Sequence, residues 1–346
     1  MTGSPPIDIP RAMAAIEDGL AERLDGRGVN SSYRVGLRGR LFSVKVHCAD
    51  RSSDLELRRI LRVDAALGGT AWYPRVIDIG LHTAAHPRLV VIRPFAPGAP
   101  PTGVRRHIGP LTDVLADLAL RAKELTVMDD LTGDYASPWL DDRENEQRGT
   151  ARLLKGRPAV PARAAEDHLA ELCASARLLT RPGTVFVYHG DLHGRNLVLG
   201  GSRRLTVIDW DEAGFSRRPA DAAKALWLSC RRGRGDFVLD PVAVRSFLEH
   251  LHRRLRTPYP AVGHLARLGA LWFLPRQHHV ALLGRRDAHL VSWYLDWVSR
   301  FWSRFERNLA LLTETAAALA DESASRPEPS WPTPDHTICD TPVTTN

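Results

Sequence analysis

The sequence predicts an α+β protein with two lobes, a small β-rich lobe followed by a larger, mainly helical one. The chain has 346 residues, which exceeds the roughly 100–200 residues of one typical domain. Strand-like runs dominate up to residue 92, and helical periodicity dominates after the proline- and glycine-rich segment Pro94–Gly98. Such a segment is typical of a hinge. We therefore expect one lobe over residues 1–95, a second over 96–325 and a disordered tail over 326–346.

The first lobe begins with a predicted amphipathic helix over residues 11–24, which starts after Pro10 and ends before Gly26. Further along, a helix is predicted over Asp50–Leu67. The strand-like runs are Ser31–Gly36, Arg40–His47, Arg75–Leu81 and Arg88–Ile92. Within the second of these runs, apolar and polar residues alternate. Lys45 is therefore expected to point away from the face that carries Phe42 and Val44.

The second lobe has helical periodicity along most of its length. Helices are expected over 109–126, 162–180, 219–231, 240–256, 261–283 and 287–321. Two short strands, Thr184–His189 and Leu205–Asp209, interrupt this pattern, and a third is expected at Asn196–Leu199. The last twenty or so residues, rich in proline and threonine, are typical of a disordered tail.

Composition and charge exclude several classes of protein. The chain is 44% hydrophobic and 25% charged, as in soluble globular proteins, and no apolar run reaches the ~18 residues of a membrane span. The N-terminus does not resemble a secretory signal. Four widely separated cysteines fit a reducing compartment. Although the net charge is +7, the basic residues are scattered and form no nucleic-acid-binding motif. We expect a cytoplasmic protein without nucleic-acid or membrane partners.

Lysine is scarce in this chain. Among the 47 basic residues, the lysines are Lys45, Lys123, Lys155 and Lys224, and all others are arginines. Where arginine is the default cation, a lysine in a buried-looking strand needs a specific reason. Lys45 is such a residue.

The strongest chemical signal is the run His189–Asn196, which reads His-Gly-Asp-Leu-His-Gly-Arg-Asn and is followed by Ile208-Asp209-Trp210. Phosphoryl transfer needs a carboxylate for the proton of the attacking hydroxyl, oxygen ligands for Mg²⁺ and a cation for the phosphates. Asp191 follows a strand and suits the first role. Asn196 and Asp209 offer hard oxygen ligands, and Lys45 offers the cation.

The run has two other interpretations. It could be a structural loop at a strand end, with Asp209 as a helix N-cap. His189 and His193 also have the four-residue spacing of a zinc-binding helix, but Gly190 and Gly194 disfavour a helix there. The fixed spacing between two predicted strands favours the phosphoryl-transfer site.

The run resembles the catalytic loop of the aminoglycoside phosphotransferase-like family of small-molecule kinases, whose pattern is H-G-D-x-H-x-x-N followed by I-D-W or I-D-F. The resemblance implies a protein-kinase-like fold, with Asp191 as catalytic base and Asn196 and Asp209 as Mg²⁺ ligands. It also implies that Lys45 binds phosphate and pairs with a carboxylate of the next helix. Glu56 is the expected partner, and Asp54 is the alternative. Asp221 resembles the buried aspartate that braces the loop.

The resemblance also suggests where the nucleotide, ATP or GTP, would bind. Leu24–Ser32 resembles the family's glycine-containing turn, so Ser31 or Ser32 is expected at the phosphates. A plain turn is the alternative. By position, Ile92 and Phe95 would lie against the adenine, although they could equally be ordinary strand core.

The expected function is ATP-dependent phosphorylation of a hydroxyl group on a small molecule. By family analogy, the leading acceptor is an antibiotic of aminoglycoside, nucleoside or peptide type. The alternatives are a metabolite kinase of choline, sugar or homoserine type and a nucleotide-binding regulator without turnover. A protein kinase is disfavoured, since the run has H-G-D and I-D-W in place of H-R-D and D-F-G and no activation segment is recognisable.

Two segments bear on the charge of the acceptor. A loop-like acidic stretch could border a polycationic acceptor or be a solvated face; it contains Asp129, Asp130, Asp134, Asp141, Asp142, Glu144 and Glu146. Residues 214–310, in contrast, hold 17 Lys and Arg against seven Asp and Glu. An aromatic helix face that includes Trp272 and Trp297 could wall the acceptor pocket or belong to the core.

Overall fold

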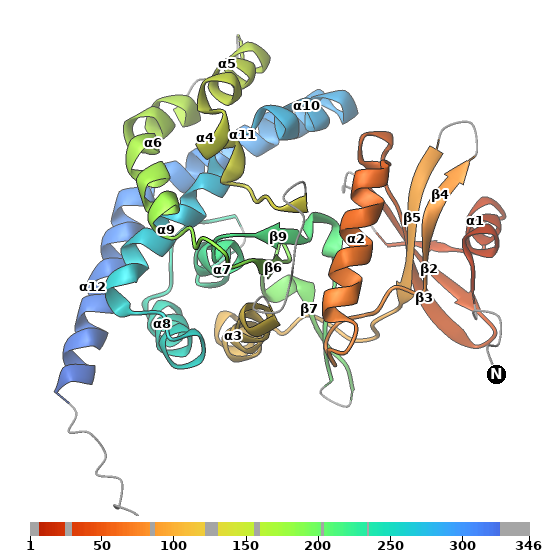
Figure 1. Cartoon of the computed structure of the whole chain (residues 1–346), viewed down its shortest axis with the longest axis horizontal. Helices are drawn as coiled ribbons and strands as arrows, with labels where there is room; N and C mark the ends of the chain where they lie inside the picture. The colour runs from red at the N-terminus through yellow and green to blue at the C-terminus, as the bar shows by residue number, and fades with distance from the viewer. Residues whose placement is uncertain are drawn as a thin grey trace, which may run out of the picture.

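The computed structural model describes residues 7–24, 30–83, 87–121, 131–155, 160–201, 204–233 and 235–325, and it has two lobes side by side (Figure 1). The smaller lobe is built on an antiparallel sheet with the strand order β1-β2-β3-β5-β4. Its strands are β1 (Glu22–Arg23), β2 (Ser31–Leu37), β3 (Arg40–Val46), β4 (Asp78–Thr83) and β5 (Pro87–Pro94). Helix α1 (Ile9–Glu17) covers one face and α2 (Asp54–Leu67) covers the face nearer the larger lobe (Figure 1).

Helix α1 is shorter than the helix predicted over residues 11–24. The side chain of Asp8 caps its start by accepting a hydrogen bond from Arg11 N. The helix ends at Glu17 because Gly19 adopts a φ of +71°, the left-handed conformation that commonly terminates helices. The chain then enters the edge strand β1, which the sequence analysis missed.

The alternation predicted for β3 is confirmed. Phe42 and Val44 are buried in the cluster under α1, which also contains Val35 of β2. Ser43 and Lys45 point to the opposite side, towards the larger lobe.

Strand β5 is apolar on both faces. Val90 and Ile92 pack into the cluster under α1, whereas Leu89 and Val91 pack with Ile60 of α2. Its sequence therefore carries no alternation that could tell one face from the other.

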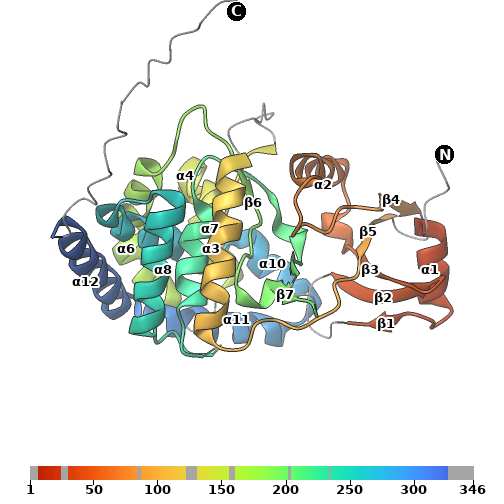
Figure 2. The ribbon, with the colours of Figure 1, turned by 90° about the horizontal axis from the view of Figure 1, so that it is seen from below.

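The larger lobe is mainly helical, and Figure 2 shows α3 and α8 side by side within it. Every residue of α7 is buried, so this helix forms the centre of the lobe. The helices are α3 (Val104–Arg121), α4 (Ser137–Asp141), α5 (Arg143–Leu153), α6 (Val160–Leu178), α7 (Ala220–Ser229), α8 (Pro241–Leu255), α9 (Val262–Ala270), α10 (Gln277–Arg286), α11 (Ala288–Trp302) and α12 (Phe305–Ala324).

Three predictions for this lobe need correction. The helix predicted over 261–283 is broken into α9 and α10, because Pro275 forces Leu274 into an extended conformation with ψ 132°. The helix predicted over 287–321 is divided into α11 and α12 around Ser303. The acidic stretch is helical rather than loop-like from Asp141 to Glu146, where it forms the end of α4 and the start of α5, whereas Asp134 precedes α4.

Two small two-stranded sheets lie in the larger lobe, on the side that faces the smaller one (Figure 1). Strand β6 (Phe186–Tyr188) pairs with β9 (Gly214–Ser216), and β7 (Leu197–Leu199) pairs with β8 (Leu205–Val207). Strand β9 was not predicted. None of the described helices is long and apolar enough to cross a membrane. The predicted tail lies outside the described residues.

Candidate active site

The β7–β8 hairpin places two of the predicted site residues side by side. Asn196 immediately precedes β7, and Asp209 follows β8 by two residues. The pairing of Leu197 with Val207 brings these two ends together, and Ile208 N donates a hydrogen bond of 2.9 Å to Asn196 O. The number of residues between Asn196 and Asp209 is therefore the number that the β7–β8 hairpin requires.

Hydrogen bonds to the buried Asp221 hold the loop before this hairpin, as predicted. His189 N and Gly190 N donate to the two oxygens of the Asp221 carboxylate at 2.6 and 2.9 Å. His189 is fully buried, so the pKa of its ring is lowered to about 4. Its neutral ring donates from Nε2 to Ile208 O at 3.0 Å and accepts from Asp191 N at Nδ1 at 3.2 Å.

Gly190 is required by the geometry of this loop. Its φ is +85°, and a Cβ at this position would lie 2.4 Å from Cβ of Glu212. Only glycine combines this conformation with so close an approach.

Asp191 has one tightly held and one loosely held carboxylate oxygen. Its Oδ1 lies 2.8 Å from Lys224 Nζ. Its Oδ2 lies 3.3 Å from Asn196 Nδ2 and 3.4 Å from His193 Nε2. Although burial alone would raise its pKa, the Lys224 and His193 side chains hold the pKa of Asp191 well below its ordinary value. Asp191 is therefore a carboxylate at neutral pH.

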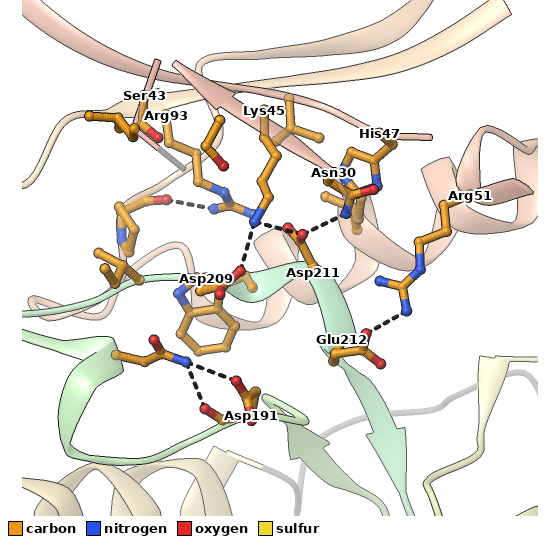
Figure 3. A pocket seen from close by; sticks show the side chains of 18 of the residues that line it. Asn30, Ser43, Lys45, His47, Arg51, Arg93, Asp191, Asp209, Asp211 and Glu212 are labelled. Carbon is orange, nitrogen blue, oxygen red and sulfur yellow. Dashed lines mark hydrogen bonds and ion pairs between the residues drawn. The ribbon is translucent and has the colours of Figure 1, made fainter. Parts of the chain in front are cut away.

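Lys45 reaches from β3 of the small lobe to two carboxylates of the large lobe. Its Nζ lies 2.7 Å from Asp209 Oδ1 and 2.6 Å from Asp211 Oδ2 (Figure 3). Burial would lower the pKa of Lys45, but Asp211 and Asp209 raise it above its ordinary value. The ammonium is thus held in the cavity that Lys45 lines, and its binding of phosphate stays a prediction.

The structure corrects the prediction that Glu56 pairs with Lys45. Glu56 lies in the first turn of α2 and forms an ion pair with Arg59, one turn further along the same helix. Arg59 Nη2 also donates to the backbone oxygen of Asp211 at 2.8 Å. The carboxylate that serves Lys45 comes instead from Asp211, and Asn30 Nδ2 donates to the same carboxylate at 2.6 Å. Among the ion pairs of the described residues, Lys45 pairs with Asp209 and Asp211 and not with Asp54.

Asp209 has an unusual backbone conformation. Its φ of +65° and ψ of 60° lie in the left-handed region, where a non-glycine residue is uncommon. Such conformations concentrate at functional sites, because the surrounding structure must hold them in place. Burial raises the pKa of Asp209, whereas Lys45 and His47 outweigh burial at Asp211 and lower its pKa to about 2.

A cavity of about 470 Å³ opens between the lobes and brings most of the predicted residues together (Figure 3). Lys45, Ser32 and Phe95 line it from the small lobe and the hinge. Asp191, Asn196 and Asp209 line it from the large lobe. The roles predicted for these residues are chemically compatible with this arrangement.

Two predicted nucleotide contacts do not reach the cavity. Ile92 is fully buried in the cluster under α1, and its neighbour Val91 lines the cavity instead. Ser31 pairs with Val46, whereas Ser32 pairs with Lys45 and shares its side of the sheet. Both corrections have the same cause, since adjacent residues of a strand point to opposite faces. The rest of the predicted glycine turn, residues 25–29, lies outside the described residues.

Asn196 and Asp209 fit a Mg²⁺ ion held partly by nucleotide phosphates. Asn196 Nδ2 donates to Asp191 O at 2.8 Å, so the amide oxygen is the atom left to act as a ligand. Within the described residues, no group of three or more His, Cys, Asp or Glu side chains could hold a metal. Mg²⁺ commonly takes only one or two protein ligands and completes its shell with phosphate and water oxygens.

The cavity is also lined by residues to which the sequence analysis gave no role. Glu212 forms an ion pair with Arg51, and His279 and Leu282 of α10 line the wall. Burial would raise the pKa of Glu212, but Arg51 and Arg276 lower it to about 2. The acidic run Asp209-Trp210-Asp211-Glu212 was the available signal for Asp211 and Glu212. No local signal pointed to Arg51, which lies outside any motif.

Neither the acidic stretch nor the aromatic helix face lines the cavity where they are described. Asp134 is buried and accepts from Arg218 Nε at 2.9 Å, so it serves the fold. Asp129 and Asp130 lie outside the described residues. Phe273 packs against both Trp297 and Phe301 in the core.

Comparisons with known proteins agree with this geometry. The chain matches the model of a phosphotransferase enzyme family over residues 21–256. It resembles a microcompartment-associated aminopropanol kinase with a TM-score of 0.66 and 18% identity, over 88% of this chain and 99% of that one. It also resembles aminoglycoside phosphotransferase APH(4)-Ia, with a TM-score of 0.55 and 16% identity over 86% of this chain and 99% of that one. The likeness to an ethanolamine kinase of Plasmodium vivax has a TM-score of 0.53 and 11% identity over 82% of each chain. No curated protein matches.

At these identities, the solved structures show the fold, which is the predicted two-lobed, protein-kinase-like one. The family match is independent of them. It covers more than half of the chain and includes both Lys45 and the run from His189 to Trp210. The chain therefore belongs to the phosphotransferase enzyme family and is a phosphotransferase.

Proposed function

We propose that this enzyme transfers the γ-phosphoryl group of ATP or GTP to a hydroxyl group of a small molecule in a Mg²⁺-dependent reaction. The observation that carries the proposal is the meeting of Asp191, Asn196, Asp209 and Lys45 in one cavity between the lobes. These are the base, the two oxygen ligands and the cation that phosphoryl transfer requires.

In the proposed reaction, the Asp191 carboxylate orients the acceptor hydroxyl and receives its proton. The hydroxyl oxygen forms a bond to the γ-phosphorus while the bond from that phosphorus to the bridging oxygen of the nucleotide breaks. Lys45 holds the phosphates from the small lobe. Asn196 and Asp209 would hold Mg²⁺, which supplies positive charge against the phosphate oxygens.

The charges of the cavity bear on the acceptor. Its acidic side chains each have a cationic partner, namely Lys45 for Asp209 and Asp211, Arg51 for Glu212 and Lys224 for Asp191. A polycationic acceptor is best bound by unpaired carboxylates. The paired charges therefore favour, among antibiotics, nucleoside or peptide types over aminoglycosides.

A small amino alcohol is the second candidate acceptor. It is supported by the likeness to an aminopropanol kinase and an ethanolamine kinase. Such a molecule carries a single ammonium group and needs much less negative charge than an aminoglycoside.

The test is ADP or GDP release by the purified enzyme, with and without Mg²⁺, against hydroxylated antibiotics and amino alcohols. Asp191→Asn is the matched control, because it keeps the shape of the side chain and removes the base. We expect acceptor-stimulated, Mg²⁺-dependent release that the variant loses. Nucleotide binding without turnover on any acceptor would favour a regulator instead.

A further inference from the structure

Lys224 is a buried lysine that touches the candidate base. It lies on the central helix α7 and its side chain is 1% exposed. The ammonium donates to Gly190 O at 2.6 Å and lies 2.8 Å from Asp191 Oδ1. It also lies 3.7 Å from the centre of the Trp272 ring. Each direction in which an ammonium can interact is thus occupied.

Burial of an ammonium group lowers the stability of the folded protein through desolvation, and the packing of α7 does not require a charge at this position. The desolvation of a lysine costs several kcal/mol, and apolar side chains of similar volume often replace buried ion pairs without loss of stability. The residues around Lys224 on α7 are mostly alanine, leucine and tryptophan, which pack without charge. The chain also uses lysine rarely, with arginine as its ordinary cation.

The ion pair is asymmetric with respect to the cavity. Asp191 lines the cavity, and its side chain is 31% exposed, whereas Lys224 does not line it. The oxygen Oδ1 is held at 2.8 Å by Lys224, while the polar contacts of Oδ2 with described residues are longer, at 3.3 Å to Asn196 and 3.4 Å to His193. One oxygen is therefore fixed from inside the protein, and the other is the one that an incoming hydroxyl can engage.

We propose that Lys224 is a positioning residue for phosphoryl transfer, which fixes the Asp191 carboxylate through Oδ1 so that Oδ2 receives the proton of the acceptor hydroxyl. This inference rests on the proposed function. In the step that it serves, the acceptor oxygen bonds to the γ-phosphorus, the bond to the nucleotide's bridging oxygen breaks, and the hydroxyl proton passes to Oδ2 and then to solvent. Lys224 keeps its own protons throughout.

A positioning role makes a distinctive kinetic prediction. Lys224 makes no contact with the cation and ligand residues Lys45, Asn196 or Asp209 among its hydrogen bonds and ion pairs in the described structure. Its replacement should therefore lower kcat and leave nucleotide binding unchanged. A misplaced reacting group costs roughly 10²-fold, so we expect kcat to fall about 10–100-fold.

The experiment compares Lys224→Met and Lys224→Gln with the wild-type enzyme. Methionine keeps much of the volume without charge, and glutamine keeps a donor for Gly190 O. Because Asp191 remains in contact with solvent, neither variant leaves an isolated buried charge, and both should fold. Leu228→Ala, one turn further along α7, is the matched control for lost packing, since Leu228 is buried and its apolar side chain can offer Asp191 neither a hydrogen bond nor a charge.

Steady-state kinetics, nucleotide titration and thermal unfolding are measured for these variants, for Asp191→Asn and for Asp191→Asn combined with Lys224→Met. We expect both Lys224 variants to lose kcat with an unchanged dissociation constant for ADP. Leu228→Ala should lose stability but keep kcat. The double variant should be no slower than Asp191→Asn alone, because Lys224 acts only through Asp191.

Three results would overturn the inference: an unchanged kcat in the Lys224 variants, an equal loss in Leu228→Ala, or additive losses in the double variant. The failure of the proposed function looks different. In that case the wild-type enzyme itself would show no acceptor-stimulated turnover, or Asp191→Asn would be as active as wild type.

Discussion

Replacing Lys45 by methionine and Asp211 by asparagine, singly and together, tests which carboxylate pairs with Lys45, the proposed phosphate-binding lysine. The structure brings Lys45 Nζ to 2.6 Å from Asp211 Oδ2, while Glu56 pairs with Arg59. If this contact operates when the nucleotide is bound, the effects of the two single changes must not add.

The structure sets the expected size of the coupling. The Lys45 and Asp211 side chains are 21% and 16% exposed, so solvent screens their interaction only in part. Contacting residues couple by about 0.5–3 kcal/mol, and a short, mostly buried ion pair belongs in the upper part of that range. We expect about 1–3 kcal/mol, which corresponds to roughly 5–150-fold in kcat/KM for ATP.

The assay is the steady-state kcat/KM for ATP of the two single variants and the double variant, with circular dichroism as the folding control. Glu56→Gln, alone and with Lys45→Met, is the matched cycle. Because Glu56 makes no ion pair with Lys45, the effects of this second pair should add within about 0.5 kcal/mol.

The opposite pattern would refute the reasoning. If Lys45 coupled to Glu56 by more than about 1 kcal/mol and not to Asp211, the contact in the structure would belong to the nucleotide-free state alone. Lys45 would then change partners when the nucleotide binds.

Three further predictions concern the catalytic loop and its hairpin. Asp191→Asn should lower kcat by more than about 10²-fold while calorimetry shows unchanged nucleotide binding, and near-native turnover would reject the role of base. Asp209→Asn should abolish the Mg²⁺ dependence of nucleotide binding, and titrations that kept this dependence would reject the ligand role. His189 has a pKa of about 4 in the folded protein against 6.5 for an ordinary histidine, so its contribution to stability is complete above pH 6.5 and is lost as the pH falls towards 4. Between pH 7 and 5 the resulting loss of unfolding free energy is about 2 kcal/mol. In urea unfolding, the free energy of His189→Asn should therefore fall by about 2 kcal/mol less than that of the wild-type protein over this range. An equal pH dependence in the two proteins would contradict the prediction.

The arrangement of the run from His189 to Asp209 could be predicted because its geometry is local. The hairpin that joins Asn196 to Asp209 is formed by residues between them in the sequence, and Gly190 is required by its own backbone φ of +85°. Fixed spacing therefore encodes fixed geometry. The alternation in β3 likewise placed Lys45 on the correct side of the sheet.

Partners that are distant in the sequence could not be predicted in the same way. Strand β5 is apolar on both faces, so nothing in its sequence distinguishes Ile92 from Val91 as the residue that faces the cavity. The sequence offers Lys45 acidic partners both on α2 and in the segment after β8. The packing of the two lobes brings Asp211, and not Glu56, into contact with Lys45. Lys224 lies 33 positions after Asp191, on a helix whose burial is a property of the whole fold.

The ion pairs of the cleft also join the two lobes. Lys45 on the small lobe contacts both Asp209 and Asp211 on the large lobe, and Arg51 contacts Glu212. A cation bound at Asp209 would compete with Lys45 for that carboxylate, but Asp211 would remain free to hold the ammonium. The same lysine could then turn towards the phosphates without losing its tether to the large lobe. Two carboxylates separated by one residue therefore suit the site better than one, because each can take a different positive charge.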